Sequence, residues 1–379
     1  MTIKTERLLT RAKKIAKKGD IEEARRLYTE ILEALPNNKE AKNGLLALEQ
    51  AKDQLKPSKS EIQSVVALHS NGQIQEALDR VETLIKDFPK EPLLYNISGA
   101  CYKEIDQLDD ALKSFEKAVA LETDYAEARY NLGIVLKELG QVDAAIKCYE
   151  ETLAIKHAYP NVHNNLGNIF LELSQLDDAV DHFEWAVAYS PDFYIAHNNL
   201  GSTFLALGQV DAAVESYEKA LTINPDYIEV HNNLGIAFHR LGQVDAAVES
   251  YEKALAVNPH YIEAHNNLGN AHRGLGQLDA AINSYRKALT INPDYANAHN
   301  NLGMTLREIG QLNGAIESYE KALTLKPDYF EAHNNLGNAL REIGQLDGAI
   351  KSYEKALTIN PDYDLAQNNL DIALKELSS

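Results

Sequence analysis

Hydrophobic residues recur at helical spacing in short stretches that alternate with turns containing glycine or proline. The stretch 229–241 shows such spacing and ends before Gly242, and glycine readily adopts the left-handed conformation that ends a helix. A second stretch, 244–257, stops just before Pro259, because proline cannot continue a helix and restricts the residue before it. The pattern therefore predicts two antiparallel helices joined by a tight turn.

The same helix pair recurs along the chain with a period of 34 residues. Each unit carries a Leu-Gly pair, an alanine twelve residues after that glycine and, in most units, a proline twelve residues further on. The pairs begin at Leu132, Leu166, Leu200, Leu234, Leu268, Leu302 and Leu336; the alanines are Ala145, Ala179, Ala213, Ala247, Ala281, Ala315 and Ala349; the prolines are Pro191, Pro225, Pro259, Pro293, Pro327 and Pro361. One helix pair cannot bury its apolar face alone, so consecutive pairs must stack. The sequence therefore predicts an all-α solenoid of antiparallel helix pairs.

These features at these offsets resemble the signature of the tetratricopeptide repeat, and the resemblance covers nearly the whole chain. It implies a right-handed superhelical array in which the first helix of each unit lines a concave groove for a protein or peptide. In this register the nine tandem units are 58–91, 92–125, 126–159, 160–193, 194–227, 228–261, 262–295, 296–329 and 330–363.

The N-terminal part of the chain departs from the tandem register. We predict a module over 1–56, in which the unit 5–38 is followed by one extra helix, and then a linker at 57–60. Ser60 and Gln63 have the spacing of a capping box that begins the next helix. The linker is therefore a candidate hinge between this module and the main array.

The C-terminal part departs from the repeat as well. After the nine repeats of 58–363 we expect a single charged helix over 364–379, in which Asp371 replaces the repeat glycine. Such a helix is expected to act as a solvating cap, and no catalytic domain is expected after it.

The chain carries a net charge of −19. This charge argues against broad binding to nucleic acid, because such binding relies on cations that neutralise phosphates. The composition is 45% hydrophobic and 25% charged, which is typical of an ordered chain.

The chain has two cysteines, Cys101 and Cys148, and neither belongs to a CxxC pair. A disulfide framework is not expected, and a reducing compartment fits. Cations recur through the N-terminus, so no apolar run suited to a signal peptide follows. No stretch approaches the ~20 apolar residues that span a bilayer. We therefore expect a cytoplasmic protein without membrane insertion.

Asparagine dominates one position of the candidate groove. In tetratricopeptide-repeat proteins the second, fifth or sixth, ninth and twelfth positions of the first helix line the groove, and this spacing is one helix face. The sixth position is asparagine in eight consecutive units: Asn131, Asn165, Asn199, Asn233, Asn267, Asn301, Asn335 and Asn369. This run resembles the asparagine ladder in the repeat region of O-linked N-acetylglucosamine transferases, which holds the backbone of a bound peptide.

The chemistry of the amide suits that role. It offers one acceptor and two donors, so it can pair with both polar groups of a peptide unit. The alternative is that these amides bond between neighbouring helices and only maintain the stack. Many units also have asparagine at the fifth position, so not every asparagine can face the groove.

Histidine also recurs once per repeat, at His163, His197, His231, His265, His299 and His333. Equivalent residues one repeat apart are separated by about 10 Å, whereas zinc needs its ligands within about 2.1 Å. We therefore expect these rings to pack between the two helices of each unit, and no metal or other cofactor is predicted.

The candidate groove is not uniform along its length. Cations occupy the twelfth position toward both ends, at Lys103, Lys137, Arg273, Arg307, Arg341 and Lys375. In the middle the same face carries Leu171, Ile195 and Leu205. We predict an apolar anchoring site flanked by positive charge that suits acidic ligand residues. The alternative for the cations is pairing with adjacent glutamates such as Glu138, Glu308 and Glu342.

The single tryptophan, Trp185, stands where sister units have lysine. With Tyr189 it forms a candidate interface patch on the outer face, because aromatic residues are enriched at interfaces. The alternative is that the unit 160–193, which also has Ser174 in place of glycine, packs differently from the others.

The leading functional prediction is a non-catalytic scaffold or adaptor for protein–protein interaction, which binds extended peptides or helical segments of an unidentified partner. The sequence has no Gly-rich phosphate loop, nucleophile elbow or clustered metal-ligand motif, so an enzyme is not predicted. One alternative is the substrate-recruiting subunit of a glycosyl- or sulfotransferase system. Another is a structural protein that self-assembles.

Overall fold

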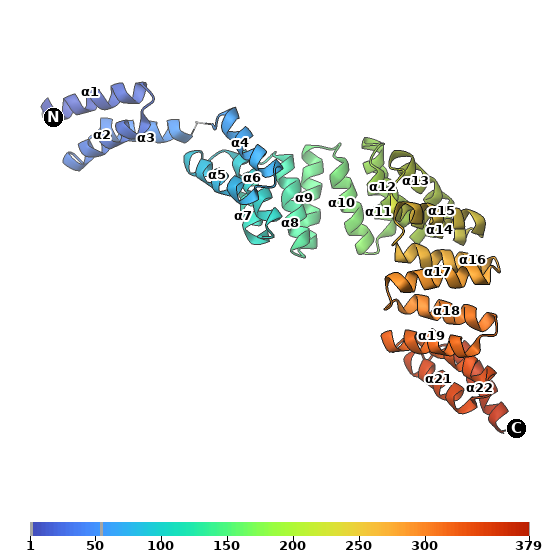
Figure 1. The fold of residues 1–379 in the computed structure, drawn as a ribbon. Coiled ribbons are helices and arrows are strands. Elements are labelled where there is room, and N and C mark those ends of the chain that lie inside the picture. Colours follow the sequence, from blue (N-terminus) through green and yellow to red (C-terminus); the bar gives the residue numbers. More distant parts are fainter. Residues whose placement is uncertain (1–2, 54–55, 379) are drawn as a thin grey trace. The chain divides into compact units, whose positions relative to one another are not determined.

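The computed structural model describes residues 3–53 and 56–378. Within this part of the chain every regular element is an α-helix, and short turns join consecutive helices (Figure 1). The prediction of an all-α array of antiparallel helix pairs is confirmed. The chain forms two compact units, Met1–Val162 and His163–Ser379.

The first unit holds nine helices among its described residues, and α10 (Pro160–Glu172) begins at its end. The nine are α1 (Ile3–Lys17), α2 (Ile21–Ala34), α3 (Lys39–Asp53), α4 (Lys59–Ser70), α5 (Ile74–Asp87), α6 (Pro92–Glu104), α7 (Leu108–Leu121), α8 (Ala126–Glu138) and α9 (Val142–Ile155).

The second unit continues with the same alternation of first and second helices. Its remaining elements are α11 (Leu176–Tyr189), α12 (Tyr194–Ala206), α13 (Val210–Ile223), α14 (Ile228–Arg240), α15 (Val244–Val257), α16 (Ile262–Gly274), α17 (Leu278–Ile291), α18 (Ala296–Glu308), α19 (Leu312–Leu325), α20 (Phe330–Glu342), α21 (Leu346–Ile359) and α22 (Asp364–Ser378).

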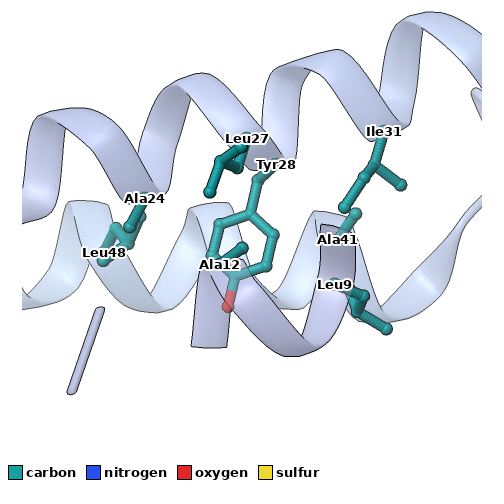
Figure 2. Packing of buried hydrophobic residues seen from close by; sticks show 8 residues of the cluster. All are labelled: Leu9, Ala12, Ala24, Leu27, Tyr28, Ile31, Ala41 and Leu48. Atoms are coloured by element: carbon teal, nitrogen blue, oxygen red, sulfur yellow. The ribbon is translucent and has the colours of Figure 1, made fainter. Parts of the chain in front are cut away.

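The three helices α1–α3 share one hydrophobic core. Its buried side chains are Leu9, Ala12, Ala24, Leu27, Tyr28, Ile31, Ala41 and Leu48, and Figure 2 shows them gathered between the helices. The Tyr28 ring lies against Gly44 of α3, where an added Cβ would stand 2.4 Å from the ring atom Cζ. The extra helix of the predicted N-terminal module therefore packs against α1 and α2.

The helix that follows the N-terminal module begins at Lys59, so Lys59 and Ser60 of the predicted linker lie in α4. The predicted Ser60–Gln63 capping box is wrong by two residues. The Ser58 side chain accepts a hydrogen bond from the Glu61 backbone N–H at 3.3 Å, and the Glu61 carboxylate accepts one from the Ser58 N–H at 2.8 Å. Ser58–Glu61 and Ser60–Gln63 both have the spacing of a capping box. The Glu61 carboxylate also accepts a hydrogen bond from the Ser58 hydroxyl at 2.7 Å, so the helix begins after Ser58 and not after Ser60.

In the repeats between 92 and 363, a glycine of the first helix lets the second helix approach closely. An added Cβ on Gly235 of α14 would lie 2.5 Å from Cε1 of Tyr251 in α15, and the same contact recurs between Gly269 and Tyr285. The tyrosine rings are buried. The helix pair is therefore held by an aromatic ring that packs closely against the backbone of the opposite helix.

The turn between the two helices requires a residue with positive φ. Gly208 and Gly242 have φ values of 75° and 74°, and Ser174 takes the same conformation with φ of 60°. The Gln175 N–H bonds to the Phe170 carbonyl at 2.8 Å, as the Gln209 N–H bonds to the Phe204 carbonyl at 2.9 Å. The repeat turn is thus preserved without glycine, at the cost of a strained serine.

We expect Ser174→Gly to raise the free energy of unfolding by about 1 kcal/mol, because glycine adopts the left-handed region without steric penalty. The matched reverse substitution, Gly208→Ser, should lower it by a similar amount. Urea unfolding followed by circular dichroism measures both changes. If both variants shift the urea midpoint in the same direction, the left-handed serine is not the source of strain in the turn.

The last helix, α22 (Asp364–Ser378), packs against α21 and α20. It begins at the residue predicted for the C-terminal cap, and Ser379 lies outside the described residues. Asp371 is exposed and accepts a hydrogen bond from the Gln367 side chain at 3.0 Å. A carboxylate therefore stands where the preceding unit has Gly337, which contacts the Tyr353 ring.

Candidate functional site

The first helices of the second unit form a continuous layer. Each contacts the first helix of the next repeat, from α12 and α14 through to α20 and α22, and each also packs against the second helices on both sides. Side chains at the sixth, ninth and twelfth positions of these helices therefore share one surface. The predicted groove residues lie on this layer.

The sixth-position asparagines are joined to the preceding repeat by a ladder of hydrogen bonds. In each rung the Nδ2 group donates to the Oδ1 atom of the fifth-position asparagine one repeat earlier. The described rungs are Asn131 to Asn96 at 3.0 Å, Asn199 to Asn164 at 3.0 Å, Asn233 to Asn198 at 3.3 Å, Asn267 to Asn232 at 3.0 Å, Asn301 to Asn266 at 3.0 Å, Asn335 to Asn300 at 3.1 Å and Asn369 to Asn334 at 2.8 Å. The amides thus connect neighbouring helices.

The two asparagine positions differ in burial. Asn232 and Asn266, at the fifth position, are buried, whereas Asn233 and Asn267, at the sixth, are half-buried. Asn165 is also half-buried, on α10. Each rung uses one of the two Nδ2 hydrogens of the sixth-position amide and fixes its orientation. The second hydrogen and the Oδ1 acceptor are not used in the rung itself. Asn199 uses both of them in further bonds, since it donates to Asn168 at 3.1 Å and accepts from Asn198 at 3.4 Å.

The three apolar residues predicted as an anchoring site differ in their environment. Leu171 is half-buried and packs against a core that contains Phe183 and Leu200. Leu205 is also half-buried and packs against the next core, which contains Tyr217. Ile195 is 38% exposed. Ile195 is therefore the apolar side chain of this set most accessible to a ligand.

The predicted groove arginines lie beside acidic residues. Arg273 pairs with Glu308 at 3.2 Å, and Arg307 pairs with Glu342 at 2.6 Å. Lys103 in the first unit makes the equivalent pair with Glu138 at 3.2 Å. These ion pairs link consecutive repeats, and they neutralise much of the positive charge that the sequence placed at the twelfth position. Arg341 is half-buried at the same position of α20.

The repeat histidines bind the turn that precedes their own helix. The Nε2 atom of His231 lies 2.7 Å from the Pro225 carbonyl oxygen, and His265 makes the same contact with Pro259 at 2.9 Å. Since a carbonyl only accepts, Nε2 carries the proton. Among the described residues no group of three or more His, Cys, Asp or Glu side chains is arranged to hold a metal ion.

These histidines should make stability depend on pH. Burial lowers the pKa of His197, His265 and His333, although the hydrogen bond to the proline carbonyl opposes this shift. The folded chain therefore binds these protons less tightly than the unfolded chain does. Their contribution to stability is complete above the ordinary histidine pKa of about 6.5 and is lost as the pH falls through the lower folded values.

We therefore expect the urea midpoint to fall between about pH 7.5 and pH 5.5, before most carboxylates titrate near pH 4. Replacing His197 and His265 with glutamine keeps a donor for the proline carbonyl and removes the titration. The double variant should show a smaller fall across the same range. A pH dependence identical to that of the wild type would contradict this assignment.

Trp185 stands in an aromatic cluster of the second unit. Its ring stacks on Tyr189 with centroids 5.5 Å apart, and it is 48% exposed. His163 lies 6.3 Å from Trp185 and 3.1 Å, between Nδ1 atoms, from His182. The unit 160–193 therefore combines an exposed aromatic pair with a packing arrangement of its own, and an interface at Trp185 stays a prediction.

The two cysteines are not activated. Burial raises the pKa of Cys101 to about 11, and it also raises the pKa of Cys148. Both side chains are therefore neutral thiols near pH 7, and a thiolate is the form that acts as a nucleophile.

The stacked helix pairs and their shared first-helix surface define a repeat scaffold. A family model described as TPR repeat matches residues 201–242, 237–276, 269–306 and 303–344, and models described as Tetratricopeptide repeat match 91–158, 124–192 and 330–363. The chain belongs to the tetratricopeptide-repeat family. Repeats of this family are generally non-catalytic scaffolds for protein–protein interaction, and this is the class of function that the fold indicates.

Solved structures share the fold. The chain is similar to the structure of the APC/C hetero-tetramer Cut9-Hcn1, with a TM-score of 0.52, 14% identity, and coverage of 99% of this chain and 97% of that one. The type IV pilus biogenesis factor PilW gives a TM-score of 0.52 and 23% identity over 56% of this chain and 98% of PilW. MamA is 31% identical over 43% of this chain and 95% of MamA, with a TM-score of 0.40. No curated protein sequence matches the chain.

Among residues 3–53 and 56–378, none of the helices combines the length and the apolar character that a bilayer crossing needs.

Proposed function

We propose that this chain is a non-catalytic adaptor whose first-helix groove binds an extended segment of a partner protein. The observation that carries the proposal is the asparagine ladder. Each rung holds a half-buried amide in one orientation, and in Asn233 and Asn267 the rung uses one of the three hydrogen-bonding groups of the amide. The resemblance of this run to the ladder of O-linked N-acetylglucosamine transferases supports the same role.

The spacing of the rungs suits an extended backbone. Equivalent positions one repeat apart are separated by about 10 Å. A chain in the extended polyproline II conformation advances about 3.1 Å per residue and has three residues per turn, so every third residue faces the same side. One asparagine therefore matches every third residue of the ligand. Each bond contributes about 0.5–1.5 kcal/mol net, so several rungs acting together can hold a segment. Such binding reads the backbone and tolerates variation in ligand side chains.

Ile195 offers a site for an apolar ligand residue, because it is the exposed member of the predicted anchoring set. Leu171 and Leu205 contribute to the adjacent surface while packing on their own cores. Arg273 and Arg307 are paired with glutamates, so they offer less positive charge to an acidic ligand residue. Arg341 is therefore proposed to contribute more to binding such a residue than either of them.

Backbone recognition can be tested with a peptide selected from a random library against the full-length chain. N-methylation at every third residue removes the amide hydrogens that face the ladder, and we expect it to weaken binding at least about tenfold, which is 1.4 kcal/mol. Methylation at the intervening residues is the matched control and should have less effect. If methylation in every register is tolerated, the ladder does not bind the ligand backbone.

A further inference from the structure

The second helices of the second unit carry a row of equivalent clefts that the sequence analysis did not predict. The first cleft lies between α11 and α13, over α12, and has a volume of about 760 Å³. Its floor is formed by His197, Leu200 and Phe204. The next two clefts, of about 620 and 580 Å³, repeat this arrangement between α13 and α15 and between α15 and α17.

The walls of these clefts combine apolar surface with acidic residues. Ile223 lines the first cleft and is 37% exposed, and Ile291, at the equivalent end of α17, lines the third. Glu184, Glu218 and Glu252 stand one repeat apart on one wall of each cleft. They are exposed and have no ion-pair partner within the described part of the chain.

The opposite wall is close to neutral. Glu215 pairs with Lys219 at 2.7 Å, and Glu249 pairs with Lys253 at 2.7 Å. The charge that remains in the first two clefts is therefore negative. The third cleft also carries Lys287, because Asn283 stands where the other two have the paired glutamate.

The histidine in each cleft has an unsatisfied acceptor. His197, His231 and His265 are 7%, 8% and 7% exposed. Their Nε2 atoms are bonded to proline carbonyls, and their Nδ1 atoms have no hydrogen-bond partner. Buried polar atoms are normally paired, so this unpaired acceptor is a repeated feature of the cleft floor, although the Nδ1 atom itself is not exposed to a ligand.

We propose that the clefts between α11 and α17 bind a basic amphipathic helix of a partner protein, on a surface separate from the asparagine groove. Equivalent clefts one repeat apart are separated by about 10 Å, and residues seven apart on a helix are separated by about 10.5 Å. An apolar side chain at every seventh position therefore reaches successive clefts. Lysine or arginine beside it meets the row of Glu184, Glu218 and Glu252.

The test uses a synthetic helical peptide of leucine and lysine, about 18 residues and 27 Å long, which spans two clefts. A peptide of the same pattern with glutamate in place of lysine is its control. The full-length chain should bind the lysine peptide, more weakly as salt increases, and should not bind the glutamate peptide. Equal binding of the two peptides, or binding of neither, would overturn the proposal.

Thr222 offers a substitution that blocks two clefts, because it lines both the first and the second. We expect Thr222→Trp to weaken the lysine peptide at least about tenfold, since it fills the space that apolar side chains enter. Thr358→Trp, at the equivalent position of α21, is the matched control and should bind as the wild type does. Equal affinity of the two variants would contradict the proposed site.

Charge variants give a second readout that does not depend on packing. The double variant Glu184→Gln and Glu218→Gln should weaken the lysine peptide about tenfold at low salt and flatten its salt dependence. Alanine substitutions of Asn233, Asn267 and Asn301 should leave this binding unchanged. If the asparagine variants abolish it and the glutamine variants do not, the peptide binds the groove and the cleft proposal is wrong.

Discussion

Replacing Gly235 with alanine is expected to lower the free energy of unfolding by about 3 kcal/mol, near the upper end for overpacking in a core. The added Cβ would lie 2.5 Å from Cε1 and 2.7 Å from Cδ1 of Tyr251, closer than any normal contact. The ring is 3% exposed and cannot move into solvent without separating α14 from α15. Urea unfolding followed by far-UV circular dichroism measures the loss.

Gly274 is the matched control, because it also lies in a helix and an added Cβ there meets no atom within 4 Å. Gly274→Ala should be neutral or stabilising by up to about 1 kcal/mol, since alanine has the higher helix propensity. Adding Tyr251→Leu to Gly235→Ala should recover part of the loss by making room for the methyl group. If Gly235→Ala unfolds at the same urea concentration as the wild type, the close packing of ring and backbone is not what holds the helix pair.

The asparagine ladder should contribute measurably to stability. Changing Asn233, Asn267 and Asn301 to alanine removes three rungs and leaves the Oδ1 acceptors of their partners unpaired. Of these partners, Asn232 and Asn266 are buried and Asn198 is half-buried. Leaving a polar group unpaired in a buried site costs about 1–3 kcal/mol. We therefore expect a total loss of roughly 3–6 kcal/mol for the triple variant.

The partners of these residues provide the matched set. Alanine at Asn198, Asn232 and Asn266 removes the same three hydrogen bonds but leaves the half-buried amides of the sixth position, which water can reach. This set should lose less stability than the first. If either triple variant is as stable as the wild type, the rungs contribute little to the free energy of unfolding.

The repeated pattern was sufficient to predict the helix pairs, because each signal recurs with the same spacing. A Leu-Gly pair such as Leu234-Gly235 marks the close approach of two helices, and a turn glycine such as Gly242 marks the positive φ between them. Ser174 shows the limit of the local signal. Its neighbours impose the left-handed conformation even where the residue type does not favour it.

The contacts between repeats were not predictable in the same way. The sequence left open whether the asparagines face a ligand or a neighbouring helix, and the structure shows that Asn267 donates to Asn232 while keeping unused hydrogen-bonding capacity. The periodicity of residues within one helix does not reveal how far that helix is shifted along its neighbour. The pairing of Arg273 with Glu308 depends on that same offset, which arises from how the helices stack.

The clefts of the second helices were missed because they belong to no single repeat. Each cleft is formed by three helices from two neighbouring repeats. A signal did exist in the sequence. The last residue of the second helix is apolar in unit after unit, as at Ile223, Val257 and Leu325, and each of these is exposed although it follows helical spacing.

The most direct test of the groove compares the two triple alanine variants as binders of one library-selected peptide, by isothermal titration calorimetry under conditions where both are folded. Both variants lack the same three rungs, but only the first lacks Asn233, Asn267 and Asn301. We expect the first to lose binding by at least about a hundredfold, or 2.7 kcal/mol, and the second to retain most of it. Equal affinity of the two variants would contradict the account, because it would mean that the asparagines hold the stack and the peptide binds elsewhere.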